Sequence, residues 1–198
     1  MATIKTQSSD RRVRRTRAAL ARALIRLVAE RDLARISVSD VAELAEVSRS
    51  SFYDHYRDVH ELAEDACTTM IDGLIESVPK PTPGADDLAQ EATESLTAFF
   101  ASLTEHAGLY RALLGAQGSA RVLDHIRGRI VEATRDRLVA GVDGRLPERV
   151  PHDVTAAFTA GALIGVAVDW LQRGCPRPPA EMAEVTWPLL HALYRING

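Results

Sequence analysis

The stretch SVSDVAELAEVSRSSFYDHY, residues 37–56, decides the fold because it carries two helix-start signals eleven residues apart. Ser37 precedes Asp40 by three residues, a variant of the capping-box pattern that predicts a helix from Val38 to Ala45. Ser48 is the cap of a second short helix, after a turn of about three residues. Two helices that are too short to be stable alone must pack against a longer neighbour. The spacing therefore predicts a helix-turn-helix.

The longer neighbour lies just before this stretch, over Arg12–Arg31. Its apolar residues recur at the i, i+4, i+7 and i+8 spacing of one helical face: Leu20, Leu24, Leu27 and Val28. Apolar periodicity continues after residue 58 and predicts further helices. They cover Asp58–Val78, Leu88 to about residue 106, Leu109–Leu114, Val122–Leu138, Asp153–Arg173 and Ala180–Arg195. No stretch alternates in polarity between hairpin turns, so we predict an all-α fold of about nine helices.

The chain divides by composition into a basic head and an acidic body. Residues 1–62 hold 12 Lys and Arg against 9 Asp and Glu, whereas residues 63–198 hold 12 against 18. Such asymmetry indicates that the N-terminal part faces a polyanion. We predict a head over residues 1–57, with a basic arm and the helix-turn-helix, and a helical body over residues 58–198. A proline-rich linker is expected at Pro79–Gly84.

Several classes of site and location are not indicated. Cys67 and Cys175 stand far apart without a zinc-binding spacing, so we expect no metal, no cofactor and a reduced, cytoplasmic setting. The longest apolar run, Ala156–Leu171, is interrupted by Asp169 and is too short to span a bilayer. Nucleotide-binding, nucleophile-elbow and zinc-protease motifs are missing from the sequence, so we predict that the protein is not an enzyme.

The second short helix has the chemistry of a DNA reader. Val47, Phe52 and Tyr56 would form its buried side, which leaves hydroxyls and Arg49 facing outward. Phosphates are bound by amides, hydroxyls and cations, and arginine can read a guanine edge in the major groove. Spacing alone leaves open a second reading, a helical hairpin with ordinary serine caps and a solvated arginine.

The run Arg14–Leu62, and above all ISVSDVAELAEVSRSSFYDHYRDVHEL at residues 36–62, resembles the DNA-binding head of the TetR family of bacterial transcriptional regulators. The segment FTAGALIGVAVDWLQRGCPRPPAEMAEVTWPLL, residues 158–190, is similar to the closing segment of many members. The resemblance implies a three-helix head that binds DNA and a helical body that binds a small effector and dimerises. By position it implies DNA-binding roles for Ser37, Ser48, Arg49, Ser50, Ser51, Tyr53 and His55.

This sequence departs from the family pattern at three positions of the head. Glu46 stands where the family has glycine in the turn, so we expect a slightly reshaped turn at a cost of about 1 kcal/mol. Val59 replaces a lysine that approaches the DNA backbone. Asp54 adds a carboxylate on the outer side, either as a cytosine acceptor or, as we favour, as a solvated residue or a partner of Arg57.

The arginine-rich run RRVRRTR, residues 11–17, precedes and enters the first helix. Such an arm could follow a phosphate strand or enter a minor groove, and Arg14 and Arg15 are the residues that we assign to it. A solvated, disordered tail is the alternative.

The body carries two weaker predictions. Small and apolar residues at helical spacing, together with the family resemblance, predict a homodimer interface at Ala157, Gly161, Gly165, Val168, Trp187, Leu190 and Tyr194. The last three of these are expected to be either interface or core residues. Inward-looking residues could line an effector pocket, namely Met70, Phe99, Leu103, Tyr110, His125 and Trp170. Plain core packing and solvated faces are the alternatives for each of these six residues.

Together these observations predict a repressor that binds a palindromic double-stranded DNA operator as a homodimer and is released by a small molecule. Two other functions stay open, regulation of the DNA-binding protein by a protein partner and an all-helical enzyme. No membrane association is expected.

Overall fold

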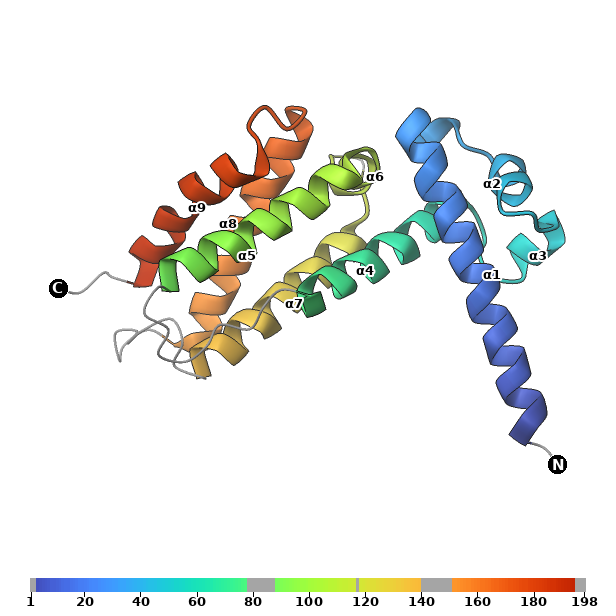
Figure 1. Cartoon of the computed structure of the whole chain (residues 1–198), viewed down its shortest axis with the longest axis horizontal. Helices are drawn as coiled ribbons and strands as arrows, with labels where there is room; N and C mark the ends of the chain where they lie inside the picture. Colours follow the sequence, from blue (N-terminus) through green and yellow to red (C-terminus); the bar gives the residue numbers. More distant parts are fainter. Residues whose placement is uncertain (1–2, 78–87, 117, 140–150, 195–198) are drawn as a thin grey trace. The chain divides into compact units, whose positions relative to one another are not determined.

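The computed structural model describes residues 3–77, 88–116, 118–139 and 151–194. Within these ranges the chain forms nine α-helices and one 3-10 helix, without a β-strand, which confirms the predicted all-α fold (Figure 1). It separates into two compact units, residues 1–67 and 68–198. The predicted linker Pro79–Gly84 lies outside the described residues.

The head begins with α1 (Thr3–Glu30) and a 3-10 turn, Leu33–Arg35. The predicted apolar face of α1 is confirmed, because Leu20, Leu24, Leu27 and Val28 are all buried. The helix starts nine residues before the predicted Arg12. No apolar stripe marks those additional turns in the sequence, which is why the periodicity did not include them.

The two short helices form as predicted. They are α2 (Val38–Leu44) and α3 (Arg49–Tyr53). At the start of α2, the Ser37 hydroxyl accepts from the Asp40 amide at 3.2 Å, and the Asp40 carboxylate accepts from the Ser37 amide at 2.8 Å. The Ser48 hydroxyl accepts from the Ser51 amide at 3.0 Å. Both caps therefore satisfy amides that a helix start leaves without partners.

The remaining six helices begin with α4, which runs from the head into the body. They are α4 (Val59–Ser77), α5 (Leu88–Glu105), α6 (Ala107–Leu114), α7 (Ala120–Val139), α8 (His152–Gln172) and α9 (Pro179–Tyr194). In the body, α5 packs mainly against α9, and α7 packs mainly against α8 (Figure 1). The Phe100 ring meets the Trp170 ring edge-on at 5.2 Å, and both side chains are almost fully buried.

One detail of the predicted core is corrected by α5. The periodicity placed Phe99 on the inward face, but Phe100 is fully buried and Phe99 is only partly buried. The two rings are adjacent, with centroids 5.3 Å apart. Since neighbouring positions differ by about 100° around a helix, apolar residues at both leave the inward one ambiguous in sequence.

The helix α8 is the most apolar element of the described residues, and by length and composition it could cross a membrane. Part of its surface is instead buried in the body, including Ala156, Ala160 and Leu171. It ends in a left-handed turn at Gly174 and Cys175, where the Cys175 amide donates to the Trp170 carbonyl at 2.9 Å. This turn ends α8 and changes the direction of the chain before α9 begins.

Candidate DNA-binding surface and body pocket

The outward face of α3 presents a compact set of polar side chains. Arg49 and Ser50 are exposed, and 52% of Tyr53 is exposed, whereas Ser51 and His55 are partly buried. Phe52 and Tyr56 are buried beneath this face, which confirms the predicted inner side, and Val47 is partly buried beside them. Hydroxyls and a guanidinium on α3, with the imidazole of His55 just after it, are groups that bind phosphates and base edges.

Of the two capping serines, Ser48 keeps hydrogen-bonding capacity at this surface. A hydroxyl that accepts from an amide, as Ser48 does, can still donate its own proton to an anion. Ser37 uses its proton on Asp40, at 2.7 Å. Hydrogen bonds from the Ser37 hydroxyl and amide, together with Arg31, hold the pKa of the Asp40 carboxyl below its usual value. Asp40 therefore stays ionised and fixes the start of α2.

The turn between α2 and α3 contains a residue with positive φ. Glu46 has φ of 56°, in the left-handed region that glycine adopts without strain. The sequence led us to expect a reshaped turn. Instead Glu46 itself takes the left-handed conformation, and its side chain is exposed.

A polar network that sequence patterns did not predict fastens α3 to its neighbours. The Tyr56 hydroxyl donates to Asp65 at 2.6 Å and accepts from Arg17 Nε at 3.0 Å. Arg17 also pairs with Asp65 at 2.7 Å. Burial, followed by the bond to Asp65, raises the pKa of Tyr56 to about 12. The side chains of Arg17, Tyr56 and Asp65 thus join α1, the turn that follows α3, and α4.

The structure around the start of α4 shows the surroundings of two positions at which the sequence departs from the family pattern, Val59 and Asp54. Val59 is 9% exposed and packs in the core, so this position has an apolar packing role. Arg57 pairs with Glu61 at 3.1 Å, and Glu61 also accepts from the Arg57 amide. Arg57 therefore pairs with Glu61 rather than with Asp54, and the exposed Asp54 agrees with the other form of the favoured reading, a solvated residue.

The arginine-rich arm is part of a helix. Arg11, Arg12, Arg14 and Arg15 are exposed along α1, which contradicts the alternative of a disordered tail for this run. A helix holds such charges at fixed spacing, and fixed cations can align with a phosphate backbone.

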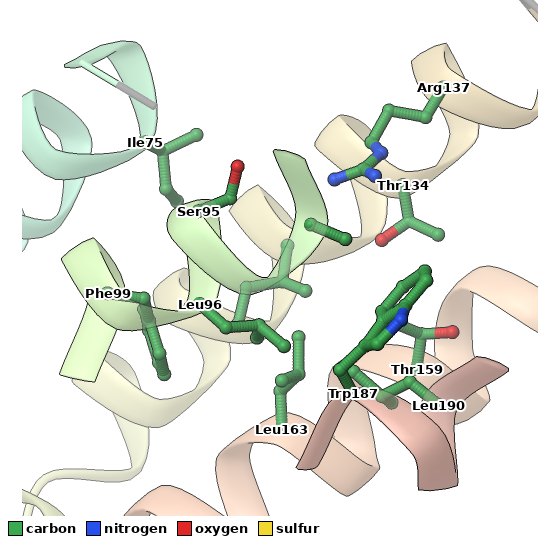
Figure 2. A pocket seen from close by; sticks show the side chains of 12 residues that line it. Ile75, Ser95, Leu96, Phe99, Thr134, Arg137, Thr159, Leu163, Trp187 and Leu190 are labelled. Carbon is green, nitrogen blue, oxygen red and sulfur yellow. The ribbon is translucent and has the colours of Figure 1, made fainter. Parts of the chain in front are cut away.

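The body contains a half-open cavity of about 140 Å³ (Figure 2). Most of its wall is apolar, and the polar side-chain groups are three hydroxyls, one indole N–H and one guanidinium. Its lining residues are Ile75, Ala92, Ser95, Leu96, Phe99, Ile130, Thr134, Arg137, Thr159, Leu163, Trp187 and Leu190. An apolar wall with a few polar groups is the usual composition of a small-molecule site.

The predicted ligand residues fall into three groups. Phe99 lines this cavity, and Met70 borders a separate open hollow between α4 and α5. Leu103, Tyr110 and Trp170 are buried in the packing of the body. His125 contacts Asp72 at 2.9 Å, beside the ion pair of Arg129 with Asp72 at 2.8 Å. The polar lining of the cavity, including Arg137, was missed because α7 carries arginines at many positions.

The predicted interface residues also separate by position. Ala157, Gly161 and Gly165 are exposed on α8, and Val168 is partly buried. Trp187 and Leu190 lie in the body interior, where Leu190 packs in a cluster with Leu96 and Ala183. The side chain of Tyr194 lies outside the described part of the chain. Four exposed apolar residues that the sequence did not single out share these helices: Val154, Phe158, Val185 and Leu189.

Comparisons with known proteins agree with this architecture. Residues 20–66 match the family model described as bacterial regulatory proteins of the tetR family, and residues 90–191 match a transcriptional regulator C-terminal region of the same group. An uncharacterized HTH-type transcriptional regulator of Bacillus subtilis strain 168, YxbF, is 40% identical over 75 residues. That alignment covers 35% of this chain and 20% of YxbF, so the match spans a fifth of that relative's length.

Two solved structures illustrate the similarity of fold. A tetR-family transcriptional regulator from Streptomyces coelicolor has a TM-score of 0.69 and 21% identity, over 90% of this chain and 79% of that one. FadR from Bacillus subtilis, solved in complex with stearoyl-CoA, has a TM-score of 0.65 and 12% identity, over 89% of this chain and 98% of that one.

Proposed function

This chain belongs to the tetR family of bacterial transcriptional regulators, and from that premise we propose that it is a cytoplasmic repressor. It binds a palindromic operator as a homodimer, and a small molecule in the body releases it. The observation that carries this proposal is the exposed polar face of α3 over its buried Phe52 and Tyr56. A short helix with this face fits the major groove, which is roughly 12 Å wide.

In this proposal each residue of the face has a distinct role. Arg49 contacts a base edge, while Ser48, Ser50 and Ser51 contact phosphates or line the groove. Ser37, whose hydroxyl donates to Asp40, caps α2 at a phosphate. Tyr53 and His55 bind phosphates through their polar tips, and the exposed Arg14 and Arg15 of α1 add contacts outside the half-site. Base contacts give discrimination between sequences, and phosphate contacts give affinity for any sequence.

The homodimer is proposed on the exposed apolar residues of α8 and α9. Phe158 is 57% exposed and Leu189 is 67% exposed, close in sequence to the exposed Gly161 and Gly165. An added Cβ at either glycine would meet no atom within 4 Å of its own chain, so the space above α8 is open for another helix. A dimer doubles the length of DNA that is read and matches a palindromic operator.

Release by a small molecule is proposed to pass through α4, one continuous helix with a polar anchor in each unit. Asp65 joins it to Tyr56 and Arg17 in the head, and Asp72 joins it to His125 and Arg129 in the body. Half-sites on one face of DNA lie about 34 Å apart, so a small shift of α4 would change the fit of two heads.

A small molecule is favoured over a protein partner by the cavity lined by Phe99, Leu163 and Trp187. Of the similar structures, FadR of Bacillus subtilis was solved in complex with stearoyl-CoA. This supports the proposal that the effector of this chain is an organic molecule. We propose that the protein is a regulator and not an enzyme.

A gel-shift with the promoter regions that flank its own gene tests the proposal. The expected result is retardation of one fragment that weakens as salt rises, because bound cations displace counterions from DNA. A folded protein that retards no fragment, or that retards all fragments equally, would contradict it.

A further inference from the structure

The body cavity is a gap within the apolar core between α5, α8 and α9. Leu96 and Leu190 belong to one buried cluster of this core, and Leu163 and Trp187 pack against it. All four residues also line the cavity (Figure 2). Protein interiors are close-packed, and a void forfeits the contacts of the side chains around it. A molecule that fills this gap therefore restores contacts that the protein alone does not make.

The volume of the cavity limits the size of such a molecule. It is about 140 Å³, close to an engineered protein cavity of about 150 Å³ that stays dry and binds benzene. A molecule with one ring fills such a space. A long acyl chain does not fit in it without rearrangement of the helices.

Two aromatic rings of the cavity wall are held in place by neighbouring rings. The Phe99 ring contacts Phe100 edge-on, with centroids 5.3 Å apart, and the Trp187 indole stacks on the His191 ring at 5.1 Å. Because these contacts already order the two side chains, little side-chain entropy is lost when a ligand packs against them. Aromatic pairs gain more than their buried area alone provides, so this wall favours an aromatic ligand over an aliphatic one.

Three of the five polar groups of the wall already have partners in the protein. The Ser95 hydroxyl donates to the Glu91 carbonyl at 2.9 Å. Arg137 and Thr159 each interact with another group of the chain. A ligand carboxylate would therefore lose its hydration without an uncommitted cation to replace it, which is costly in an apolar site. None of the twelve described residues that line the cavity is acidic, so a cationic ligand would also lack a counter-charge, and the wall favours a neutral ligand.

We propose that the effector is a neutral aromatic molecule of about one ring, packed against Phe99, Leu163 and Trp187. Its binding needs no hydrogen bond from Arg137 or Thr159. The inference rests on the proposed function only in calling the ligand an effector, because binding itself follows from the cavity.

Calorimetric titration of the full chain with toluene, benzoate and 1-octanol tests this ligand class. Burial of about 200 Å² of ring surface gives an expected dissociation constant for toluene of the order of 0.1 mM. Benzoate has the same ring and should bind at least about 10-fold more weakly, because its carboxylate loses hydration. The neutral chain of 1-octanol should also bind more weakly than toluene. No binding of toluene, or binding of benzoate or 1-octanol that is as tight as that of toluene, would overturn the proposal.

Tryptophan fluorescence locates the bound ring. The chain has two tryptophans, of which Trp187 lines the cavity and Trp170 is 1% exposed in the packing of the body. Iodobenzene is a neutral one-ring probe whose heavy atom quenches fluorescence on contact. It should quench the wild-type protein and hardly quench Trp187→Phe, which keeps an aromatic wall. Equal quenching of both proteins would place the ring elsewhere and contradict the proposal.

Two matched variants test whether the ring occupies the cavity. Leu163→Trp adds a ring inside the cavity and should abolish toluene binding. Val139→Trp adds the same ring on α7 outside the cavity, where Val139 is 77% exposed, and should keep toluene binding. Equal loss of binding in both variants, or full toluene affinity in a folded Leu163→Trp, would refute the site.

A third variant covers the case in which Leu163→Trp does not fold. Leu163→Ala enlarges the cavity and should make the two-ring molecule 1-naphthol bind at least about 10-fold more tightly than it binds to the wild type. Unchanged affinity for 1-naphthol would contradict the proposed site.

The operator gel-shift is run on the same samples, with and without toluene, and loss of retardation on addition of toluene is the expected result. Toluene that binds without weakening the DNA complex would overturn its role as an effector. Sequence-specific DNA binding by a protein that binds no toluene would reject the ligand class and leave the proposed regulator intact. Toluene binding without any sequence-specific DNA binding would reject the regulator and leave the ligand site intact.

Discussion

At the scale of single residues, the backbone of the head is strained at Glu46. Glu46 holds φ of 56° in the turn between α2 and α3. An L-residue with a Cβ is strained there, while glycine is not. The side chain is exposed, so nothing in its packing compensates for the strain.

We therefore predict that Glu46→Gly stabilises the protein by about 1 kcal/mol, as measured by urea unfolding. Glu43→Gly is the matched control, since Glu43 is an exposed glutamate in α2 with helical conformation. It should destabilise by about 1 kcal/mol, because glycine is a poor helix former. Destabilisation of similar size in both variants would show that the turn is not strained.

Substitutions at Arg49 and Tyr53 are expected to affect DNA binding in different ways, the first its sequence preference and the second its affinity for any sequence. Arg49→Ala should reduce the preference for operator over random DNA by about 1–3 kcal/mol, the value of a good base contact. Tyr53→Phe should weaken operator and random DNA alike, because it removes a phosphate contact. Fluorescence anisotropy at two salt concentrations measures both, and the assignment fails if each variant weakens the two DNAs equally.

The sequence was informative about residues of this kind only where a repeating pattern marked them. The caps were predicted because Ser37 and Ser48 each stand just before the first residue of a helix, and the apolar face because Phe52 and Tyr56 recur at helical spacing. The partners of the Tyr56 hydroxyl were not predictable, because Arg17 and Asp65 lie 39 and 9 positions away and meet it only after folding.

At the scale of elements, this network determines how α3 is held against α1 and α4. Tyr56 is the middle of three side chains, and Arg17 also lies over its ring at 5.4 Å. Removing the hydroxyl breaks two hydrogen bonds to charged groups but leaves the pair between Arg17 and Asp65.

Tyr56→Phe should destabilise the protein by about 2 kcal/mol near neutral pH, the cost of losing hydrogen bonds to charged groups. The pKa of Tyr56 is raised to about 12, from about 10 in unfolded chains. Its protonated form is therefore favoured by folding, and that stability is present below pH 10 and lost as pH rises towards 12.

Urea unfolding across this range measures the effect. The difference in stability between wild type and Tyr56→Phe should shrink above pH 10. Tyr53→Phe is the control, since 52% of that side chain is exposed and its stability should match wild type throughout. A difference for Tyr56→Phe that stays constant up to pH 12 would contradict the assigned network.

The order of helices was predictable from sequence, but their contacts in the body were not. Periodicity identifies a face of each helix, and it does not specify which helix covers that face. The sequence therefore left Trp187 and Leu190 open as interface or core residues, and in the described body they lie beside Leu96 on α5. Apolar exposure at Phe158 and Leu189 became evident only once the packing of α5, α7, α8 and α9 was known.

At the scale of the whole molecule, the proposed dimer buries these two exposed residues. Because both copies contribute the same surface to a two-fold interface, Phe158→Glu or Leu189→Glu would bury two negative charges there, one from each copy. Each should raise the monomer–dimer dissociation constant at least about 100-fold, as measured by analytical ultracentrifugation. Val139→Glu is the control, because Val139 is 77% exposed on α7 and outside the proposed interface. A dimer that is unaffected by both α8 and α9 variants would place the interface elsewhere.

The central claim is that two copies of one short helix read a palindromic DNA sequence. Selection of binding sites from random duplex DNA by this chain tests it most directly. We expect an enriched sequence with two-fold symmetry, and we expect the Arg49→Ala variant to fail to enrich it. An enriched sequence without symmetry, or no enrichment by a folded wild-type protein, would contradict it.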